Sequence, residues 1–335
     1  MKKIKLSILD QSVVIKGKTA REAVEETITT AKLAENYGYT RFWISEHHNS
    51  PFIAGSSPEL LMVKLASETN KIRIGSGGIL LPNHSALKVA ENFRMLETLF
   101  PERIDLGIGR APGGDRITAS LLNPSNNFSE ESYLQQLVHL QHFFRDTAVT
   151  AHGPLLAVPQ ATTIPQQWIL SSSGGSGSIA SKFGMGLVIA KFINGMAGAE
   201  IAEFYRKNFK PSDQFKTPCV LVSVFVLCGE TDEIAKRMRK FMDYVLVQFE
   251  KGKFGDFGDN SFIQDYVFTD DELLRLHNNR GRIVSGTAES VKKQLIQLAE
   301  DFDVDEIIIS TMANSSELRK KSFELIGSAF ELTKN

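Results

Sequence analysis

Three adjacent residues that could carry chemistry, Glu46, His47 and His48, follow a short apolar run at residues 41–45. Side chains alternate between the two faces of a strand, so the two histidines do not share a face while the backbone stays extended. A metal site would need histidines on one face, and no further nitrogen or sulfur ligand is spaced to help. The sequence therefore predicts no metal here. Two interpretations stay open: an inward His47 that serves as acid, base or cofactor contact, and a histidine that only bonds a loop.

A serine- and glycine-rich segment at residues 171–178 lies between an apolar run at 168–171 and a helix-like stretch. Free backbone N–H groups at a helix start, together with short hydroxyl side chains, can bind phosphate without a Walker-type lysine. Arg110, in a loop that a barrel would place next door, is the expected cationic partner. A flexible linker has a similar composition, so that alternative stays open. No G-x-G-x-x-G motif opens the chain, which disfavours a nicotinamide site.

Glycines cluster at the ends of two apolar runs within residues 72–115. Backbone without side chains can lie flat, so both segments could support a large planar ligand above a sheet. Ordinary turns are the alternative interpretation. The glycines concerned are Gly75, Gly77 and Gly78 in the first group, and Gly107, Gly109, Gly113 and Gly114 in the second.

The elements that must position these groups alternate along the whole chain. Short apolar runs are followed by segments with helical spacing of apolar residues, such as residues 20–37, which end at Gly38. Such alternation without a long polar linker predicts an α/β protein, a single TIM (β/α)8 barrel with insertions spanning residues 1–335. The predicted strands are residues 4–9, 41–45, 72–75, 104–108, 168–171, 187–190, 220–227 and 306–310.

One insertion interrupts this alternation at residues 252–282, before the last strand and helix. It is rich in glycine and aspartate. Long loops in compact domains are often lids or binding loops, so the segment is a candidate lid. A surface decoration without a role is the alternative.

Composition and charge exclude several other classes of protein. With 42% hydrophobic and 23% charged residues, the chain has enough apolar material for a sizeable core. Lys and Arg total 38 against 39 Asp and Glu, so no net field favours nucleic acid or an anionic membrane. The longest apolar run, 219–228, suits a buried strand and not a membrane span, and the first residues are too polar for a secretory signal. Two cysteines at opposite ends of that run favour a reducing, cytoplasmic location.

Several motifs together resemble one known family. They read FWISEHHN at residues 42–49, IGSGGILLPNHS at 74–85, AENF at 90–93 and PERIDLGIGRAPGGD at 101–115. This set is similar to the luciferase-like, flavin-dependent monooxygenases, and within them to an uncharacterised bacterial branch. The resemblance implies a barrel that binds FMN at the carboxyl ends of its strands. It also implies that reduced FMN and O2 oxygenate a small organic substrate, with a separate flavin reductase as electron donor.

The same resemblance assigns roles to individual residues. Gly77 and Gly78 match the family's non-prolyl cis peptide beneath the flavin ring, and His47 matches a histidine that faces the flavin. The phosphate contacts are matched by Arg110, Ser172, Ser173 and Ser176. A homodimer through helices near residues 58–69 and 85–100 is expected. The chain departs from its relatives in the extra glycines Gly174, Gly175 and Gly177 and in Lys191, which, if it points inward, would place a positive charge near flavin or substrate.

Two alternatives to an oxygenase stay open at this point. A barrel of this kind could bind flavin without oxygenating anything. A relative that uses a deazaflavin would instead be a hydride-transferring dehydrogenase and would not consume O2.

Overall fold

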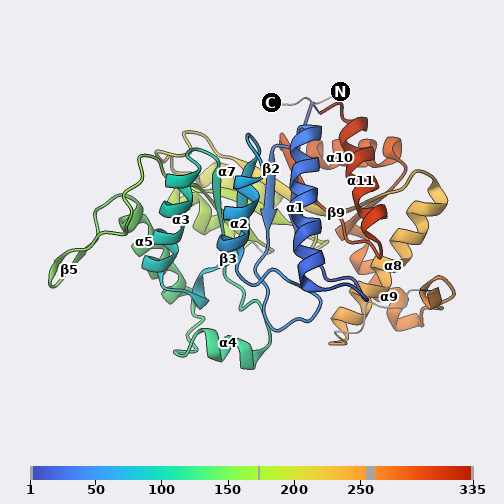
Figure 1. Cartoon of the computed structure of the whole chain (residues 1–335), viewed down its shortest axis with the longest axis horizontal. Coiled ribbons are helices and arrows are strands. Elements are labelled where there is room, and N and C mark those ends of the chain that lie inside the picture. Colours follow the sequence, from blue (N-terminus) through green and yellow to red (C-terminus); the bar gives the residue numbers. More distant parts are fainter. Residues whose placement is uncertain (1–2, 173, 254–260, 333–335) are drawn as a thin grey trace.

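The computed structural model describes residues 3–172, 174–253 and 261–332. Eight parallel strands close into a barrel surrounded by helices, which confirms the predicted fold (Figure 1). Neighbouring strands pair in chain order, and the barrel closes because β11 pairs with both β9 and β1. The barrel strands are β1 (Lys5–Asp10), β2 (Arg41–Ile44), β3 (Arg73–Leu80), β4 (Ile104–Gly109), β7 (Gln166–Ser171), β8 (Gly186–Ala190), β9 (Val220–Cys228) and β11 (Glu306–Ser310).

The helices cover the outer face of the barrel, and local signals fix several of their ends. In α1 (Ala20–Tyr37), Thr19 and Glu22 form a capping box and Gly38 ends the helix at φ 85°. Further helices around the barrel are α2 (Pro58–Ser67), α3 (Ala86–Leu99), α5 (Glu130–Phe144), α6 (Gly175–Phe183), α7 (Glu200–Asn208), α8 (Asp232–Glu250), α10 (Ala288–Asp301) and α11 (Ser316–Ala329). No helix in the described part of the chain is long and apolar enough to cross a membrane.

Several elements were not predicted from the sequence. A short helix, α4 (Arg116–Leu122), follows β4, and β5 (Val149–Thr150) pairs with β6 (Gly153–Pro154) in a small hairpin. A further strand, β10 (Ile283–Gly286), pairs with the end of β9. The predicted first glycine-rich strand is also longer than expected, because β3 continues through Gly77 and Gly78 to Leu80 with a register shift.

The insertion at residues 252–282 is not a simple loop in its described part. It contains the 3-10 helices η2 (Ser261–Gln264) and η3 (Arg280–Arg282) on either side of α9 (Asp270–Asn279). Thr269 and Glu272 form a capping box at the start of α9, and their spacing of three residues is a local sequence signal for a helix start. Residues 254–260 of this segment lie outside the described residues. Its role as a lid stays a prediction.

Two tryptophans fill the barrel interior. The rings of Trp43 and Trp168 lie 5.8 Å apart, edge to face, among apolar side chains from β1, β8, β9 and β11. A Cβ atom on Gly75 would lie 2.6 Å from the Trp43 ring. The glycine is needed there because the larger residue on the neighbouring strand occupies its space.

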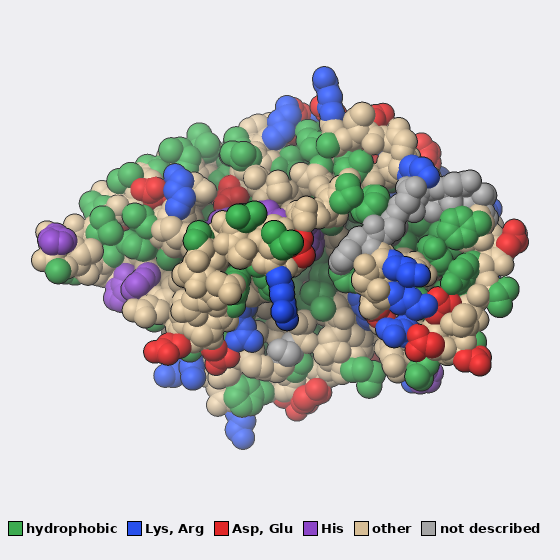
Figure 2. Space-filling view, turned by 90° about the horizontal axis from the view of Figure 1, so that it is seen from below, with side chains coloured by type: hydrophobic (Ala, Val, Ile, Leu, Met, Phe, Trp, Pro, Cys, Tyr) green, Lys and Arg blue, Asp and Glu red, His purple; other side chains and the backbone are tan. Residues whose placement is uncertain are grey.

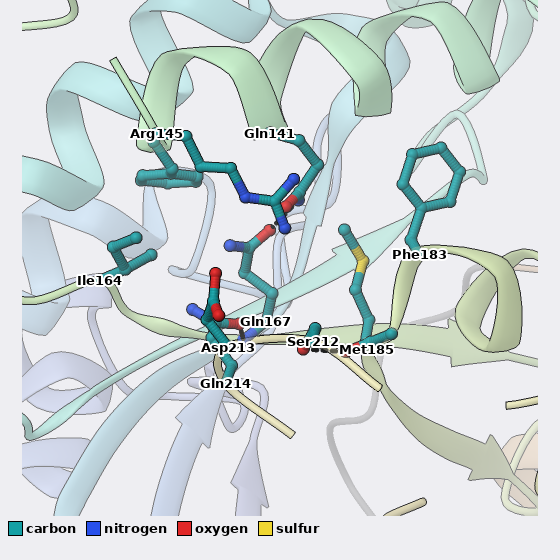
Figure 3. A pocket seen from close by; sticks show the side chains of 11 residues that line it. Gln141, Arg145, Ile164, Gln167, Phe183, Met185, Ser212, Asp213 and Gln214 are labelled. Atoms are coloured by element: carbon teal, nitrogen blue, oxygen red, sulfur yellow. Dashed lines mark hydrogen bonds between the residues drawn. The ribbon is translucent and has the colours of Figure 1, made fainter. Parts of the chain in front are cut away.

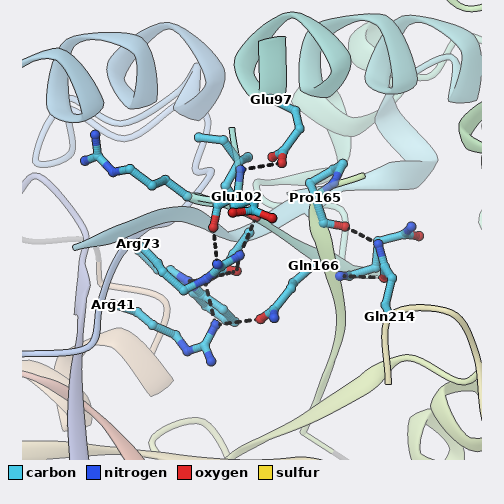
Figure 4. A network of polar contacts seen from close by, with 12 residues as sticks. Arg41, Arg73, Glu97, Glu102, Pro165, Gln166 and Gln214 are labelled. Carbon is cyan, nitrogen blue, oxygen red and sulfur yellow. Dashed lines mark hydrogen bonds and ion pairs between the residues drawn. The ribbon is translucent and has the colours of Figure 1, made fainter. Parts of the chain in front are cut away.

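A charged network closes the amino end of the barrel (Figure 4). The buried Arg41 donates to Glu306 at 2.8 Å, to Asp105 at 2.9 Å and to Gln166 at 3.1 Å. Burial alone would raise the pKa of Asp105, but the positive charges of Arg41 and Arg73 outweigh it and hold the pKa below its usual value. With this end occupied by paired charges, a ligand would enter the barrel from the carboxyl end.

Candidate active site

The exits of four adjacent strands bring the predicted site residues to one face of the molecule. His47 follows β2, Gly77 and Gly78 lie near the end of β3, Arg110 follows β4, and Ser172 follows β7. Figure 2 looks onto this face, which is hollowed near its centre. The barrel topology therefore gathers these groups at the carboxyl end, the end at which parallel α/β barrels carry their chemistry.

The peptide bond between Gly77 and Gly78 is cis, as the resemblance implies. A Cβ atom on Gly78 would lie 2.6 Å from the carbonyl oxygen of Gly107, so the backbones of β3 and β4 approach closely here. A Cβ on Gly77 would meet Leu9 at 2.6 Å. Gly78 is thus required by backbone packing itself, whereas the contact at Gly77 is with the end of a flexible side chain; packing of this kind is a different reason from the flat support that the sequence suggested.

Arg110 is exposed and forms an ion pair with Glu130, at the start of α5, with 2.7 Å between the two side-chain atoms. The pair was not predicted. The hydroxyl of Tyr133 is buried nearby; burial raises its pKa, and the charge of Arg110 acts weakly against that shift. An exposed ion pair contributes little free energy, so Arg110 can exchange Glu130 for another anion.

The serine- and glycine-rich segment forms the start of α6. The helix begins at Gly175, and no side chain in the described part of the chain caps its N-terminus. A Cβ atom on Gly174 or Gly175 would meet no atom within 4 Å, so the space above these residues is open. Ser172 lies just before this turn, where its carbonyl oxygen accepts from Asn194 at 3.0 Å. Ser176 lies in the first turn and is half-buried, whereas Ser173 lies outside the described residues.

Glu46 organises the exit of β2, a role that the sequence did not suggest. Its carboxylate is fully buried and accepts hydrogen bonds from His48 Nε2, His84 Nε2 and the Leu80 N–H, each at 2.8 Å. Burial opposes ionisation, but these donors lower the pKa of Glu46. Nothing in the spacing of residues 46 and 84 predicts their contact, since it depends on the neighbouring positions of β2 and β3.

The pKa values of His84 and His47 are shifted in opposite directions. Burial lowers the pKa of His84, but the hydrogen bond and the charge of Glu46 together raise it by more, so its pKa lies above the ordinary value. For His47, burial dominates and lowers the pKa, which favours the neutral imidazole at neutral pH. Among the described residues, no group of three or more His, Cys, Asp or Glu side chains could hold a metal ion.

Two further polar side chains, Ser45 and Lys191, follow or end barrel strands near the mouth. The Ser45 side chain is buried, and its Oγ atom has no hydrogen-bond partner among the residues that the structure describes. The ammonium group of Lys191 donates to the carbonyl oxygens of Gly195 and Ala197, at 2.7 and 3.1 Å. Lys191 therefore secures its own loop, and its expected approach to flavin or substrate is not what the described contacts show.

Surface pockets also occur at the opposite, amino end of the barrel (Figure 3). One is narrow and is lined by Gln141, Gln167, Met185 and neighbouring residues; an adjoining pocket of about 560 Å³ adds exposed lysines such as Lys182 and Lys210. We place the candidate active site at the carboxyl end, because the exits of β2, β3, β4 and β7 and the start of α6 lie there.

A family model described as "Luciferase-like monooxygenase" matches residues 4–306, nearly the whole chain. The chain belongs to the luciferase-like monooxygenase family. Among relatives, this luciferase-like protein is 41% identical over 330 residues to the uncharacterized protein YwcH of Bacillus subtilis, covering 98% of this chain and 99% of that one. It is 32% identical to the N-acetyl-S-alkylcysteine monooxygenase of the same organism, covering 97% and 98% of the two chains.

Solved structures agree with this membership. The crystal structure of apo-MsnO8 superposes with a TM-score of 0.91 and 32% identity, covering 99% of this luciferase-like chain and all of that one. Two more distant structures share the fold alone. One is an oxygenating constituent of 3,6-diketocamphane monooxygenase from Pseudomonas putida in complex with FMN, at TM-score 0.70, 18% identity and coverage of 98% and 97%. The other is an F420-dependent secondary alcohol dehydrogenase, at TM-score 0.61, 12% identity and coverage of 97% and 99%.

Proposed function

We propose that this protein is an FMN-dependent monooxygenase that uses reduced FMN and O2 to oxygenate a small organic substrate. The observation that carries the proposal is the mouth of the barrel, where the exits of β2, β3, β4 and β7 meet in a member of the luciferase-like monooxygenase family. No nicotinamide-binding motif opens the chain, so a separate flavin reductase would supply the reduced FMN.

The residues at the mouth fit a flavin mononucleotide. The open, uncapped start of α6 offers backbone N–H groups to a phosphate, and Ser172, Ser173 and Ser176 add hydroxyl groups. Arg110 would complete the phosphate site by exchanging Glu130 for the phosphate, which carries more charge. The ring system would lie against the exits of β2 and β3, where Ser45, Gly77 and Gly78 stand.

Bound reduced FMN would supply the activation of O2; overall, one oxygen atom enters the substrate and the other leaves as water while FMN is oxidised. The protein would orient the cofactor and the substrate and would exclude water from them. The buried amino end and the tryptophan layer close the barrel interior from below the site, so water could reach the reacting groups only from the mouth itself. A neutral His47 could accept or return a proton there.

The experiment is a titration of the purified protein with FMN, followed by oxygen uptake with reduced FMN. We expect saturable FMN binding. We also expect that addition of a substrate increases oxygen uptake and yields an oxygenated product. An N-acetyl-S-alkylcysteine is the first substrate to test, because a relative over nearly the full length is named for it. Binding without substrate-dependent uptake would identify a flavin-binding protein that is not an oxygenase.

A deazaflavin-dependent dehydrogenase is the second candidate, because the fold is shared with an F420-dependent alcohol dehydrogenase. Parallel titration with F420 separates the two proposals. Tight F420 binding, substrate-dependent change in its absorbance and no oxygen uptake would favour the dehydrogenase.

We also propose that the insertion at residues 252–282 acts as a lid; equal proteolytic sensitivity of this segment with and without FMN and substrate would count against that role.

A further inference from the structure

Glu46 links the exits of two neighbouring strands through a single buried carboxylate. Its Oε1 atom accepts hydrogen bonds from the Nε2 atoms of two histidines. His48 follows β2, as Glu46 does, and His84 lies between β3 and α3. Its Oε2 atom receives the backbone N–H of Leu80, the last residue of β3. All three contacts are 2.8 Å long, so the carboxylate makes three hydrogen bonds at once.

The chemistry of a carboxylate fixes the state of its partners. An ionised carboxylate only accepts hydrogen bonds, so each histidine must carry a proton on Nε2. The Nδ1 atoms of His48 and His84 are then left to accept, or, in a charged imidazolium, to donate. Removing the carboxylate would release both rings and leave the buried Leu80 N–H without this acceptor, a state that a buried backbone group avoids.

The exits of β2 and β3 are in turn tied to the exit of β4. The His48 N–H donates to the Gly113 carbonyl at 3.1 Å, and the Asn83 amide donates to the Pro112 carbonyl at 3.0 Å. Both acceptors lie just after Arg110. Displacement of either strand exit would therefore be passed to the loop that carries Arg110.

We propose that Glu46 is the positioning residue of the mouth: by holding His48, His84 and Leu80 together, it sets the geometry in which the cofactor is bound. This inference rests on the proposed function and names a residue that deepens it. Glu46 does not need to touch the cofactor, because it acts through the three strand exits that it connects.

A matched control exists on the other side of the fold. Glu35, near the end of α1, also accepts three N–H groups through one carboxylate, from Asn70, Lys71 and Ile72, at 2.8, 2.6 and 3.0 Å. These contacts fix the start of β3, away from the mouth. Glu35→Gln and Glu46→Gln therefore remove equivalent carboxylates, one at the amino end and one at the carboxyl end of the same strand.

The test compares FMN affinity, thermal unfolding and backbone hydrogen exchange in the full-length wild type and both variants. We expect both variants to unfold at lower temperature, but only Glu46→Gln to weaken FMN binding, by about tenfold or more, as expected when charge-assisted hydrogen bonds are lost. Exchange at residues 79–84 should rise without cofactor in Glu46→Gln alone. A folded Glu46→Gln variant with wild-type FMN affinity, or with unchanged exchange at residues 79–84, would overturn the inference.

A second pair of variants covers the case in which Glu46→Gln fails to fold. His84 is only half-buried, so His84→Leu should fold while removing one donor, and His84→Gln restores an N–H donor. We expect His84→Leu to weaken FMN binding and His84→Gln to recover much of it; equal affinities in both variants and in the wild type would refute the role of the cluster. If the wild type itself binds no FMN, the proposed function fails, and the exchange measurement alone decides the inference.

Discussion

At the scale of single residues, the candidate site combines groups whose surroundings give them different tasks. Burial keeps His47 neutral, whereas Glu46 favours the charged form of His84. Arg110 stays exposed, where an incoming anion could replace its surface partner Glu130. The chemistry of each group therefore depends on its neighbours more than on its residue type.

Arg110→Ala should weaken FMN binding by about 1–3 kcal/mol, because a charge-assisted contact to the phosphate is lost. Fluorescence quenching of FMN on titration with protein measures the change. Arg145→Ala is a suitable control, since Arg145 is also exposed but lines the pocket at the amino end. FMN affinity that is equal in wild type and Arg110→Ala would remove Arg110 from the phosphate site.

The ion pair between Glu46 and His84 should make stability depend on pH. The pKa of His84 is raised in the folded state above the ordinary value of 6.5, so its stabilisation is fully present below that pH and is lost as pH rises through the folded pKa. Urea unfolding of wild type and His84→Gln across neutral pH measures this. We expect the stability difference between the two proteins to shrink as pH rises.

His47 titrates in both proteins and cancels in that comparison. Its lowered pKa acts in the opposite sense, because protonation below the ordinary value favours the unfolded chain. A stability difference between wild type and His84→Gln that stays constant with pH would contradict the assigned ion pair.

At the scale of elements, β3 and its neighbours show how small and large residues are matched across strands. Gly75 and Gly77 on β3 leave room for the Trp43 and Leu9 side chains of β2 and β1. Gly107 on β4 does the same for Leu170 on β7, with 2.9 Å between its hypothetical Cβ and the leucine methyl. The glycine-rich strands are therefore part of a barrel core that is filled from the adjacent strands.

Gly75→Ala should destabilise the fold by about 1–3 kcal/mol, because the new methyl group would overlap the Trp43 ring and Asp105. Denaturant unfolding, monitored by the fluorescence of the two tryptophans, measures the loss. Gly175→Ala is the matched control, because its Cβ would meet open space at the start of α6 and should be neutral or stabilising by about 0.5–1 kcal/mol. Equal stability of Gly75→Ala and wild type would show that the core can rearrange.

At the scale of the whole molecule, α2 and α3 pack side by side and present apolar side chains outward. Leu60 is 75% exposed, Met95 48% and Leu99 51%. These are the helices through which a homodimer is expected from the family, and exposed apolar residues gathered on adjacent helices are typical of such an interface. The dimer itself stays a prediction.

The wild type should sediment as a dimer at micromolar concentration, and a Leu60→Asp, Met95→Asp double variant should sediment as a monomer, because charges would be buried in the interface. Leu121→Asp, at an equally exposed position on α4, is the control and should leave the sedimentation coefficient unchanged. A monomeric wild type would remove this interface.

The sequence by itself determined the barrel. All eight barrel strands were predicted within a few residues, except that β3 runs on to Leu80, because strands buried on both faces form apolar runs and helix caps are local signals. The short helix α9 was missed because it lies in an insertion without that alternation, and β10, which follows the insertion directly, was missed with it. The residues at the mouth could also be predicted from the sequence, because they directly follow the predicted strands.

Only the tertiary structure decided how those residues are joined. Glu46 meets His84, Arg110 meets Glu130, and Arg41 spans the amino end to Glu306 and Asp105. Each pair is separated by at least 20 residues in the chain, and its contact forms only when the tertiary structure brings the segments together; for Arg41 and Glu306 this requires closure of the barrel through β11 and β1. Local patterns encode strands and caps, whereas the partners of a buried charge are set by which strands become neighbours.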